Sequence, residues 1–107
     1  MDTPKILLVD DEPEASDTIE RYLIRHLECS IYKADDGRHA LELIGKENFD
    51  VAILDVKMPG ISGIDVLRRL KAVNPQAGVL VVTGWNSQHV AEAAIKEGAV
   101  DYIIKPS

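Results

Sequence analysis

The sequence predicts an α/β domain built around a doubly wound parallel sheet of five strands. Short apolar runs alternate along the chain with longer segments in which apolar residues recur at helical spacing. Strands separated by helices in this way form βαβ units, in which the strands run parallel. The length of 107 residues and the apolar content of 46% fit a single globular domain.

The predicted strands differ in how continuously apolar they are. Three uninterrupted runs, at residues 6–9, 51–54 and 79–82, predict central strands that are covered on both faces. Polar residues such as Lys33 and Asp101 interrupt the runs at 31–34 and 100–104, which we therefore expect at the sheet edges. With right-handed crossovers, the simplest strand order is 2-1-3-4-5, which creates a crevice at the carboxyl ends of the first and third strands.

Four helices are predicted from the apolar periodicity. The first helix begins at Pro13, and the second is capped by Asp35 or Asp36. The third ends at Asn74-Pro75, and the fourth runs from about Ser87 to a glycine cap at Gly98. The expected inward faces of the first three are Ala15, Ile19, Tyr22, Leu23 and Leu27; Ala40, Leu41 and Ile44; and Ile64, Leu67, Leu70 and Val73. The fourth is rich in alanine, which buries little area, so we expect it to be weakly held.

Composition excludes several classes of function. The formal net charge of −6 opposes direct nucleic-acid binding, because phosphate backbones are also negative. The single cysteine, Cys29, cannot form an internal disulfide. No apolar run is long enough to span a membrane, and no secretory signal follows Met1, so we expect a cytoplasmic domain.

Polar residues follow four of the predicted strands. Asp10 and Asp11 follow the first strand, Asp55 follows the third, Thr83 follows the fourth and Lys105 follows the fifth. Parallel strands place all of these at one rim of the sheet. Two carboxylates about 5 Å apart repel by roughly 3 kcal/mol at an effective dielectric constant of ~20, so such a cluster calls for a cation. Oxygen ligands at an open rim favour Mg²⁺, and a carboxylate, a hydroxyl and an ammonium around it suit phosphoryl transfer with Asp55 as the nucleophile.

Four motifs at these positions resemble those of the response-regulator receiver domain of two-component signalling. They are Leu8-Val9-Asp10-Asp11-Glu12, Asp55-Val56-Lys57-Met58-Pro59-Gly60, Val82-Thr83-Gly84 and Asp101-Tyr102-Ile103-Ile104-Lys105-Pro106. The resemblance covers essentially the whole chain and implies a flavodoxin-like fold. The segment from Thr83 to Pro106 is also similar to receivers of ATPase-type transcription activators.

The resemblance also implies a role for each site residue. Asp55 accepts a phosphoryl group from the phosphohistidine of a histidine kinase or phosphotransfer protein. Asp11 binds Mg²⁺ directly, Asp10 binds it mainly through water, and the backbone carbonyl of Lys57 is a further ligand. The hydroxyl of Thr83 and the ammonium of Lys105 hold phosphoryl oxygens.

The implied output is a conformational switch. Thr83 moves toward the phosphoryl group and Tyr102 turns inward, which reshapes the surface of the fourth helix and fifth strand. Such a domain is a regulatory phosphoacceptor that promotes only its own phosphorylation and dephosphorylation, not a metabolic enzyme. It signals to an output domain in the parent protein.

The family normally has a fifth helix after the Lys-Pro pair, and this chain ends at Ser107. Four helices leave part of one face of the sheet bare. We therefore expect that residues 1–107 are a receiver truncated before its last helix, or that a second copy of the chain covers the face as a homodimer.

Other interpretations of the same residues remain. Asp10, Asp11 and Glu12 could simply cap the helix that begins at Pro13. Trp85 either shields the site from water or is only a loop aromatic. One competing function is a receiver-like interaction module used for dimerisation without phosphorylation, although a decayed site would be expected to lack some of these residues. Another is an aspartate-nucleophile phosphatase, but such enzymes need an acid where this chain has Lys57.

Overall fold

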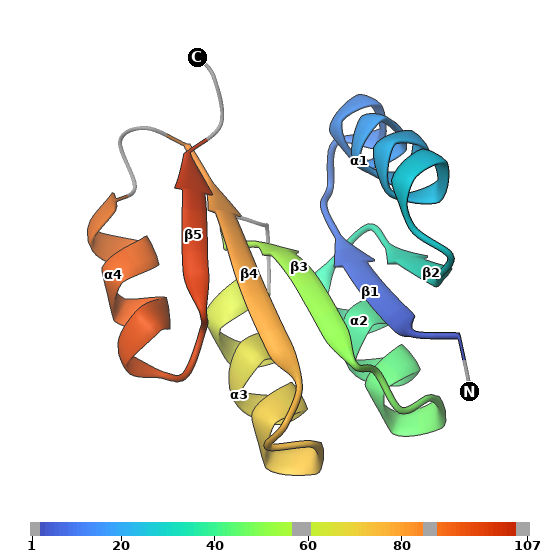
Figure 1. Ribbon diagram of the computed structural model, residues 1–107. Helices are drawn as coiled ribbons and strands as arrows, with labels where there is room; N and C mark the ends of the chain where they lie inside the picture. The colour runs from blue at the N-terminus through green and yellow to red at the C-terminus, as the bar shows by residue number, and fades with distance from the viewer. Residues whose placement is uncertain (1–2, 57–60, 85–87, 105–107) are drawn as a thin grey trace.

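The computed structural model describes residues 3–56, 61–84 and 88–104, and it contains the predicted parallel sheet. The strands are β1 (Lys5–Val9), β2 (Ser30–Ala34), β3 (Val51–Asp55), β4 (Gly78–Thr83) and β5 (Asp101–Ile104). Every pairing is parallel, and the order is β2-β1-β3-β4-β5. The predicted fold class and strand order are therefore confirmed, with β2 and β5 at the two edges (Figure 1).

Four helices connect the strands: α1 (Pro13–His26), α2 (Gly37–Lys46), α3 (Gly63–Val73) and α4 (Gln88–Lys96). α1 begins at Pro13, as predicted, and Asp36 caps α2 by accepting a hydrogen bond from the backbone N–H of His39 at 2.8 Å. α3 ends at Val73. After α4, Gly98 has a φ of +112°, and the N–H groups of Gly98 and Ala99 donate to the carbonyls of Ile95 and Ala94, which is the hydrogen-bond pattern of a Schellman cap.

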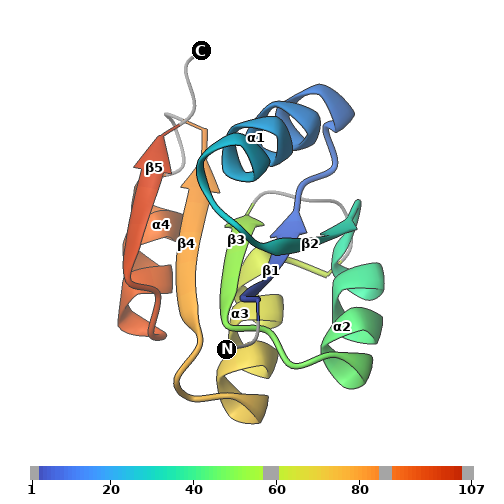
Figure 2. The same ribbon diagram turned by 45° about the vertical axis from the view of Figure 1, so that its right-hand side comes forward.

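The two faces of the sheet are covered unequally. α2, α3 and α4 pack on one face, where Leu7, Leu54 and Val81 belong to the larger hydrophobic core. α1 lies across the other face, where a smaller cluster includes Leu8, Ile53 and the half-buried Ile19 and Leu23 of α1 (Figure 2). This division follows from the alternation of side chains along each strand.

The β4–β5 half of the α1 face is bare in the part of the chain that the structure describes. An open groove of about 450 Å³ runs between α1 and this half of the sheet. Its lining consists of Glu12, Glu14, Ala15, Thr18, Ile19, Val82, Ile103 and Ile104. Of these lining residues, Ile103 is 52% exposed. The bare face expected from the sequence is therefore present.

The predicted inward faces of the helices are partly wrong. Tyr22 and Leu27 are 64% and 54% exposed, although the apolar periodicity predicts both in the core. Leu27 follows the last helical residue of α1 and has extended dihedral angles, so it leaves the helical face. Tyr22 continues the line of Ala15 and Ile19 along the groove side of α1, and its ring contacts that of His26 in a tilted arrangement at a centroid distance of 4.4 Å.

The other predicted helix faces are closer to the structure. Ala40, Ile44, Leu67 and Leu70 are buried, and Leu41 and Ile64 are half-buried against the core. Val73 is 49% exposed because it is the last residue of α3. Within the described residues, no helix is both long and apolar enough to cross a bilayer.

Candidate functional site

The carboxyl ends of β1, β3 and β4 bring the predicted acids and the threonine hydroxyl to one rim of the sheet. Val9 pairs with Leu54, so Asp10 and Asp55 are the next residues on neighbouring strands. Asp55 pairs with Val82, and Thr83 follows it on β4. Residues up to 73 positions apart in the chain therefore meet because the strands are parallel.

Four carboxylates form a tight cluster at this rim. One oxygen from each of Asp10, Asp11, Glu12 and Asp55 lies within 4.8 Å of the others. Asp10 and Asp55 are 4% and 5% exposed, whereas Asp11 and Glu12 face solvent. Burial strengthens the repulsion between ionised carboxylates, so the cluster fits a cation held at its solvent side.

The turn that carries these acids is fixed by its own hydrogen bonds. The Oδ1 atom of Asp10 accepts the backbone N–H of Glu12 at 2.9 Å, and the N–H of Asp10 donates to the carbonyl of Ala34 on β2 at 3.1 Å. The carbonyl of Glu12 then accepts the N–H of Ser16 at 3.0 Å as α1 begins. One carboxylate oxygen of Asp10 thus organises the backbone that presents Asp11.

Thr83 contributes a buried hydroxyl to the same rim. Its side chain is fully buried, and its Oγ1 atom has no hydrogen-bond partner among the residues that the structure describes. A buried hydroxyl without a partner costs about 1–3 kcal/mol, so such a group calls for a ligand. A phosphoryl oxygen bound beside Asp55 is an acceptor of the required kind.

The structure adds Glu12 to the candidate ligands. The sequence alone names Glu12 only as one of three acids that could cap the helix beginning at Pro13, and the signal that could have identified it as a ligand is its position directly after Asp10 and Asp11. Its backbone N–H binds Asp10 and its carboxylate joins the cluster. Glu12 therefore serves both the turn and the acidic site.

Three predicted functional positions lie outside the described residues: Lys57, Trp85 and Lys105. The residue that precedes each of them is described. Ile104, the residue before Lys105, pairs with Thr83 across β4 and β5. Tyr102 of β5 is half-buried and packs against the core on the α2–α4 face. Ile104 therefore lies beside Thr83 at the same rim.

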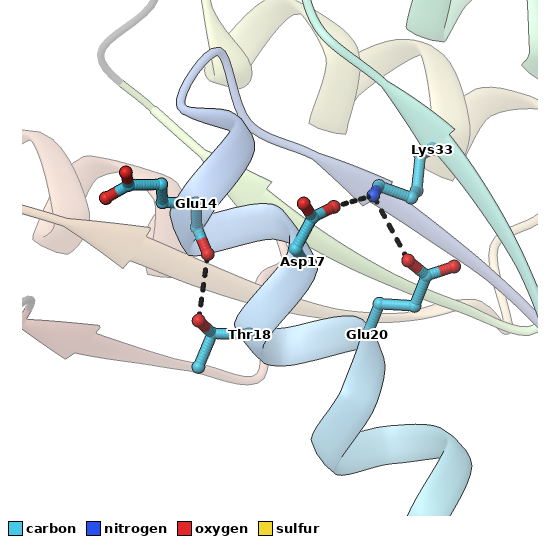
Figure 3. Close-up of polar contacts among 5 residues, drawn as sticks. All are labelled: Glu14, Asp17, Thr18, Glu20 and Lys33. Atoms are coloured by element: carbon cyan, nitrogen blue, oxygen red, sulfur yellow. Dashed lines mark hydrogen bonds and ion pairs between the residues drawn. The ribbon is translucent and has the colours of Figure 1, made fainter.

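A second hollow, of about 280 Å³, adjoins the acidic cluster on the β2 side, where Asp10, Asp11, Ser16, Lys33 and His39 line it together with four other residues. Lys33 is not free to neutralise the cluster, because its ammonium binds Asp17 and also Glu20 of α1, the latter at 3.1 Å (Figure 3). The hydrogen bond from Lys33 is the main cause that lowers the pKa of Asp17 below its ordinary value of 3.8.

The donor set determines which metal fits. All four clustered groups are carboxylates, and hard oxygen ligands select Mg²⁺, Ca²⁺ or Mn²⁺ over softer ions. Few protein ligands at an open rim suit Mg²⁺, which keeps several water molecules and completes its shell with phosphate oxygens. The clustered carboxylates therefore fit a hard divalent cation.

Comparisons with known proteins agree with this geometry. The sequence profile of the response regulator receiver domain matches residues 6–107. The transcriptional regulatory protein ZraR of Escherichia coli is 40% identical over 105 residues, which are 98% of this chain and 24% of that protein. This chain therefore spans about a quarter of the length of ZraR.

Two of the similar solved structures are response regulators that contain bound ions. A Burkholderia pseudomallei response regulator with a phosphorylated aspartic acid and a calcium ion has a TM-score of 0.86 and 32% identity, over 97% of this chain and 61% of that one. The Thermotoga maritima response regulator TrrA in complex with Mg²⁺ and BeF has a TM-score of 0.84 and 30% identity, over 97% of this chain and 88% of that one. Because the family profile covers nearly the whole chain and the acidic site lies where the strand order reverses, this chain belongs to the response regulator receiver domain family of two-component signalling.

Proposed function

We propose that this chain is a phosphorylation-switched receiver in which Asp55 accepts a phosphoryl group from a histidine kinase or phosphotransfer protein in the presence of Mg²⁺. The observation that supports this most directly is the buried carboxylate of Asp55, which lies within 4.8 Å of three other carboxylates. The buried hydroxyl of Thr83 at the next strand end, which has no hydrogen-bond partner within the described part of the chain, supports the same function.

The proposed step is a displacement at phosphorus. A carboxylate oxygen of Asp55 forms the new P–O bond while the P–N bond of the phosphohistidine breaks. The imidazole nitrogen keeps the electron pair and takes a proton from solvent. The Thr83 hydroxyl donates to one equatorial phosphoryl oxygen, and Lys105 is proposed to bind another.

The proposed metal ligands are the carboxylates of Asp11 and Asp55, the carboxylate of Asp10 through water, and the backbone carbonyl of Lys57. Bound Mg²⁺ would neutralise the charge on the equatorial phosphoryl oxygens. The protein residues contribute the geometry, because hydrogen bonds of the Asp10 carboxylate and of the Asp10 N–H fix the turn that presents Asp11.

The proposed output involves Thr83 and Tyr102. A phosphoryl group on Asp55 gives the Thr83 hydroxyl an acceptor. Thr83 pairs with Ile104 on β5, and Ile104 is two positions from Tyr102. Movement of Thr83 is therefore proposed to be coupled to the half-buried ring of Tyr102 and to the α4–β5 surface. The domain would act on no substrate other than its own phosphoryl group.

The proposed setting is a larger cytoplasmic regulator. The receiver would pass its signal to an output domain in the parent protein, and the match to a transcriptional regulatory protein supports a transcription activator of the ATPase type. No direct contact of these residues with nucleic acid is proposed, because the net charge is −6.

The test is phosphorylation by acetyl phosphate, which needs no cognate kinase. Wild-type protein with Mg²⁺ should gain one acid-stable, alkali-labile phosphoryl group, seen as a mass shift and mapped to Asp55. Asp55→Asn should gain none. Asp50→Asn, at the opposite end of β3, is the matched control and should be labelled like the wild type.

The alternative function is a receiver-like module that dimerises without phosphorylation, and the bare apolar groove with the exposed Ile103 favours it. The same experiment separates the two functions. An unlabelled wild-type protein that dimerises would support the interaction module, whereas labelling at Asp55 supports the switch.

A further inference from the structure

The site depends on two glycines whose lack of a side chain allows close contact between backbones. Gly63, the first residue of α3, is buried against the end of β3, and its N–H donates to the carbonyl of Val56 at 3.4 Å. A Cβ at Gly63 would lie 2.6 Å from the carbonyl oxygen of Asp55 and 2.7 Å from the Cα of Val56. α3 can therefore begin directly behind the phosphoacceptor only if this residue has no Cβ.

Gly37 makes a similar close contact with Ile61, at a greater distance from the site. It is the first residue of α2, and a Cβ there would lie 2.4 Å from the carbonyl oxygen of Ile61 and 2.7 Å from the Cβ of Ile61. Ile61 is two residues before Gly63, and Ser62 between them caps α3. A displacement of Ile61 is therefore transmitted through Ser62 to the helix start that rests on Asp55.

Glycine is required at these two positions because a side chain would not fit, and not because of the backbone conformation. Gly98 is the only described residue with a positive φ, so Gly37 and Gly63 have backbone angles that any residue adopts. The atoms that a Cβ would meet first are backbone atoms, which cannot rotate away as a flexible side chain could. A substitution must therefore move α3 or the peptide between Asp55 and Val56.

We infer that Gly37 and Gly63 are positioning residues of the phosphoacceptor site, which hold the carboxylate of Asp55 at the correct distance from Asp10 and Asp11. This inference rests on the proposed function. A displaced Asp55 weakens the shared metal site and misaligns the nucleophile. Substitution of residues that orient metal ligands commonly lowers the affinity for the metal by about 10–100-fold.

The chain contains a matched control for each expected effect. Gly45 lies in the last turn of the same helix as Gly37, is exposed, and has no atom within 4 Å of a built Cβ. Val79 is buried near the amino end of β4, away from the acidic rim, so Val79→Ala lowers stability without touching the site. The first control tests the loss of a glycine, and the second tests the loss of stability alone.

The experiment measures Mg²⁺ affinity by titration calorimetry and the rate of labelling by acetyl phosphate, at a temperature where circular dichroism shows each variant to be folded. Gly37→Ala and Gly63→Ala should each raise the Mg²⁺ Kd by about tenfold or more and slow labelling by a similar factor. Gly45→Ala and Val79→Ala should keep the wild-type Kd within about twofold. Adding Ile61→Gly to Gly37→Ala removes the side-chain part of the clash and should restore part of the affinity.

Each outcome decides the inference. Wild-type Kd and labelling rate in folded Gly37→Ala would overturn it, even if Gly63→Ala fails to fold. An equal loss of affinity in Val79→Ala would also overturn it, because the effect would then follow from stability. If the wild type itself neither binds Mg²⁺ nor accepts a phosphoryl group, the proposed function fails, and this inference fails with it.

Discussion

The ammonium of Lys33 on the edge strand β2 binds the carboxylate of Glu20 on α1 at 3.1 Å and also that of Asp17 (Figure 3). Ser16 is the only residue of α1 that is fully buried, so this helix has little apolar anchorage on the sheet. The ion pairs from Lys33 therefore help to hold in place the helix that begins directly after the acidic turn.

Replacing Lys33 with methionine should lower stability in a pH-dependent way. The hydrogen bond from Lys33 lowers the pKa of Asp17 in the folded protein below 3.8, so this contribution is present above pH 3.8 and is lost as the pH falls through the folded pKa. The pKa of Lys33 is raised above 10.5 by its bonds to Asp17 and Glu20, so the contribution is also lost as the pH rises through that folded pKa. Urea unfolding at several pH values should show that Lys33→Met lowers the free energy of unfolding most between the folded pKa of Asp17 and that of Lys33. A deficit that is the same at pH 2.5 and pH 7 would contradict this prediction.

Mg²⁺ should raise the melting temperature of the wild-type domain, because it relieves repulsion within the carboxylate cluster. At a free Mg²⁺ concentration 100 times the Kd, the free energy of unfolding should rise by about 2.7 kcal/mol. Asp11→Asn should raise the melting temperature in the absence of metal and should reduce the increment on adding it. Glu92→Gln, an exposed change on α4, is the control and should respond like the wild type. A melting temperature unchanged by chelation would contradict the crowded-carboxylate argument.

Gly98→Ala should destabilise the domain by about 1–2 kcal/mol, because an alanine at positive φ is strained. The cap that ends α4 needs the φ of +112° at Gly98. A Cβ on this residue would also lie 3.2 Å from the Cε of Lys71. Gly78→Ala, at the start of β4, is the control, since a built Cβ meets nothing within 4 Å. Chemical denaturation of both variants would decide, and equal effects would refute a special role for Gly98.

The bare apolar groove should make the isolated 107-residue chain associate with concentration or bind a hydrophobic dye. The groove lies between α1 and β5, and its Ile103 is 52% exposed. Ile103→Ser should weaken association and dye binding, whereas Val73→Ser, which is exposed at the end of α3, should leave both unchanged. Sedimentation at several concentrations would measure this. A wild-type monomer that is unchanged on dilution and binds no dye would contradict the prediction.

The sequence predicts the sheet well because its signals are local and strong. Continuous apolar runs in β1, β3 and β4 and interrupted runs in β2 and β5 predict the observed order, since burial on both faces determines which strands are central. The helix starts at Pro13 and after Asp36 were also predictable, because capping depends on adjacent residues.

The sequence does not predict features that depend on contacts between distant segments. Tyr22 has the spacing of a core residue but is exposed, because nothing in the described part of the chain covers that side of α1. The clashes that a side chain at Gly37 or Gly63 would create involve another segment, so both glycines resemble ordinary turn residues in the sequence. The strand-end positions of Asp10, Asp55 and Thr83 were predictable, whereas the full burial of the Thr83 hydroxyl is evident only in the packed structure.

All five strands point the same way, so the molecule has two chemically different poles. One end of the sheet carries Asp10 and Asp55 at the acidic rim, and the opposite end carries Lys5, Asp50 and the exposed Asn48 before β3. A fluorophore or an immobilising tether placed at Asn48 would therefore leave the acidic rim open to a kinase. Because the strands are parallel, the domain is suited to attachment to a surface as a sensor, with no change to the residues of the acidic rim.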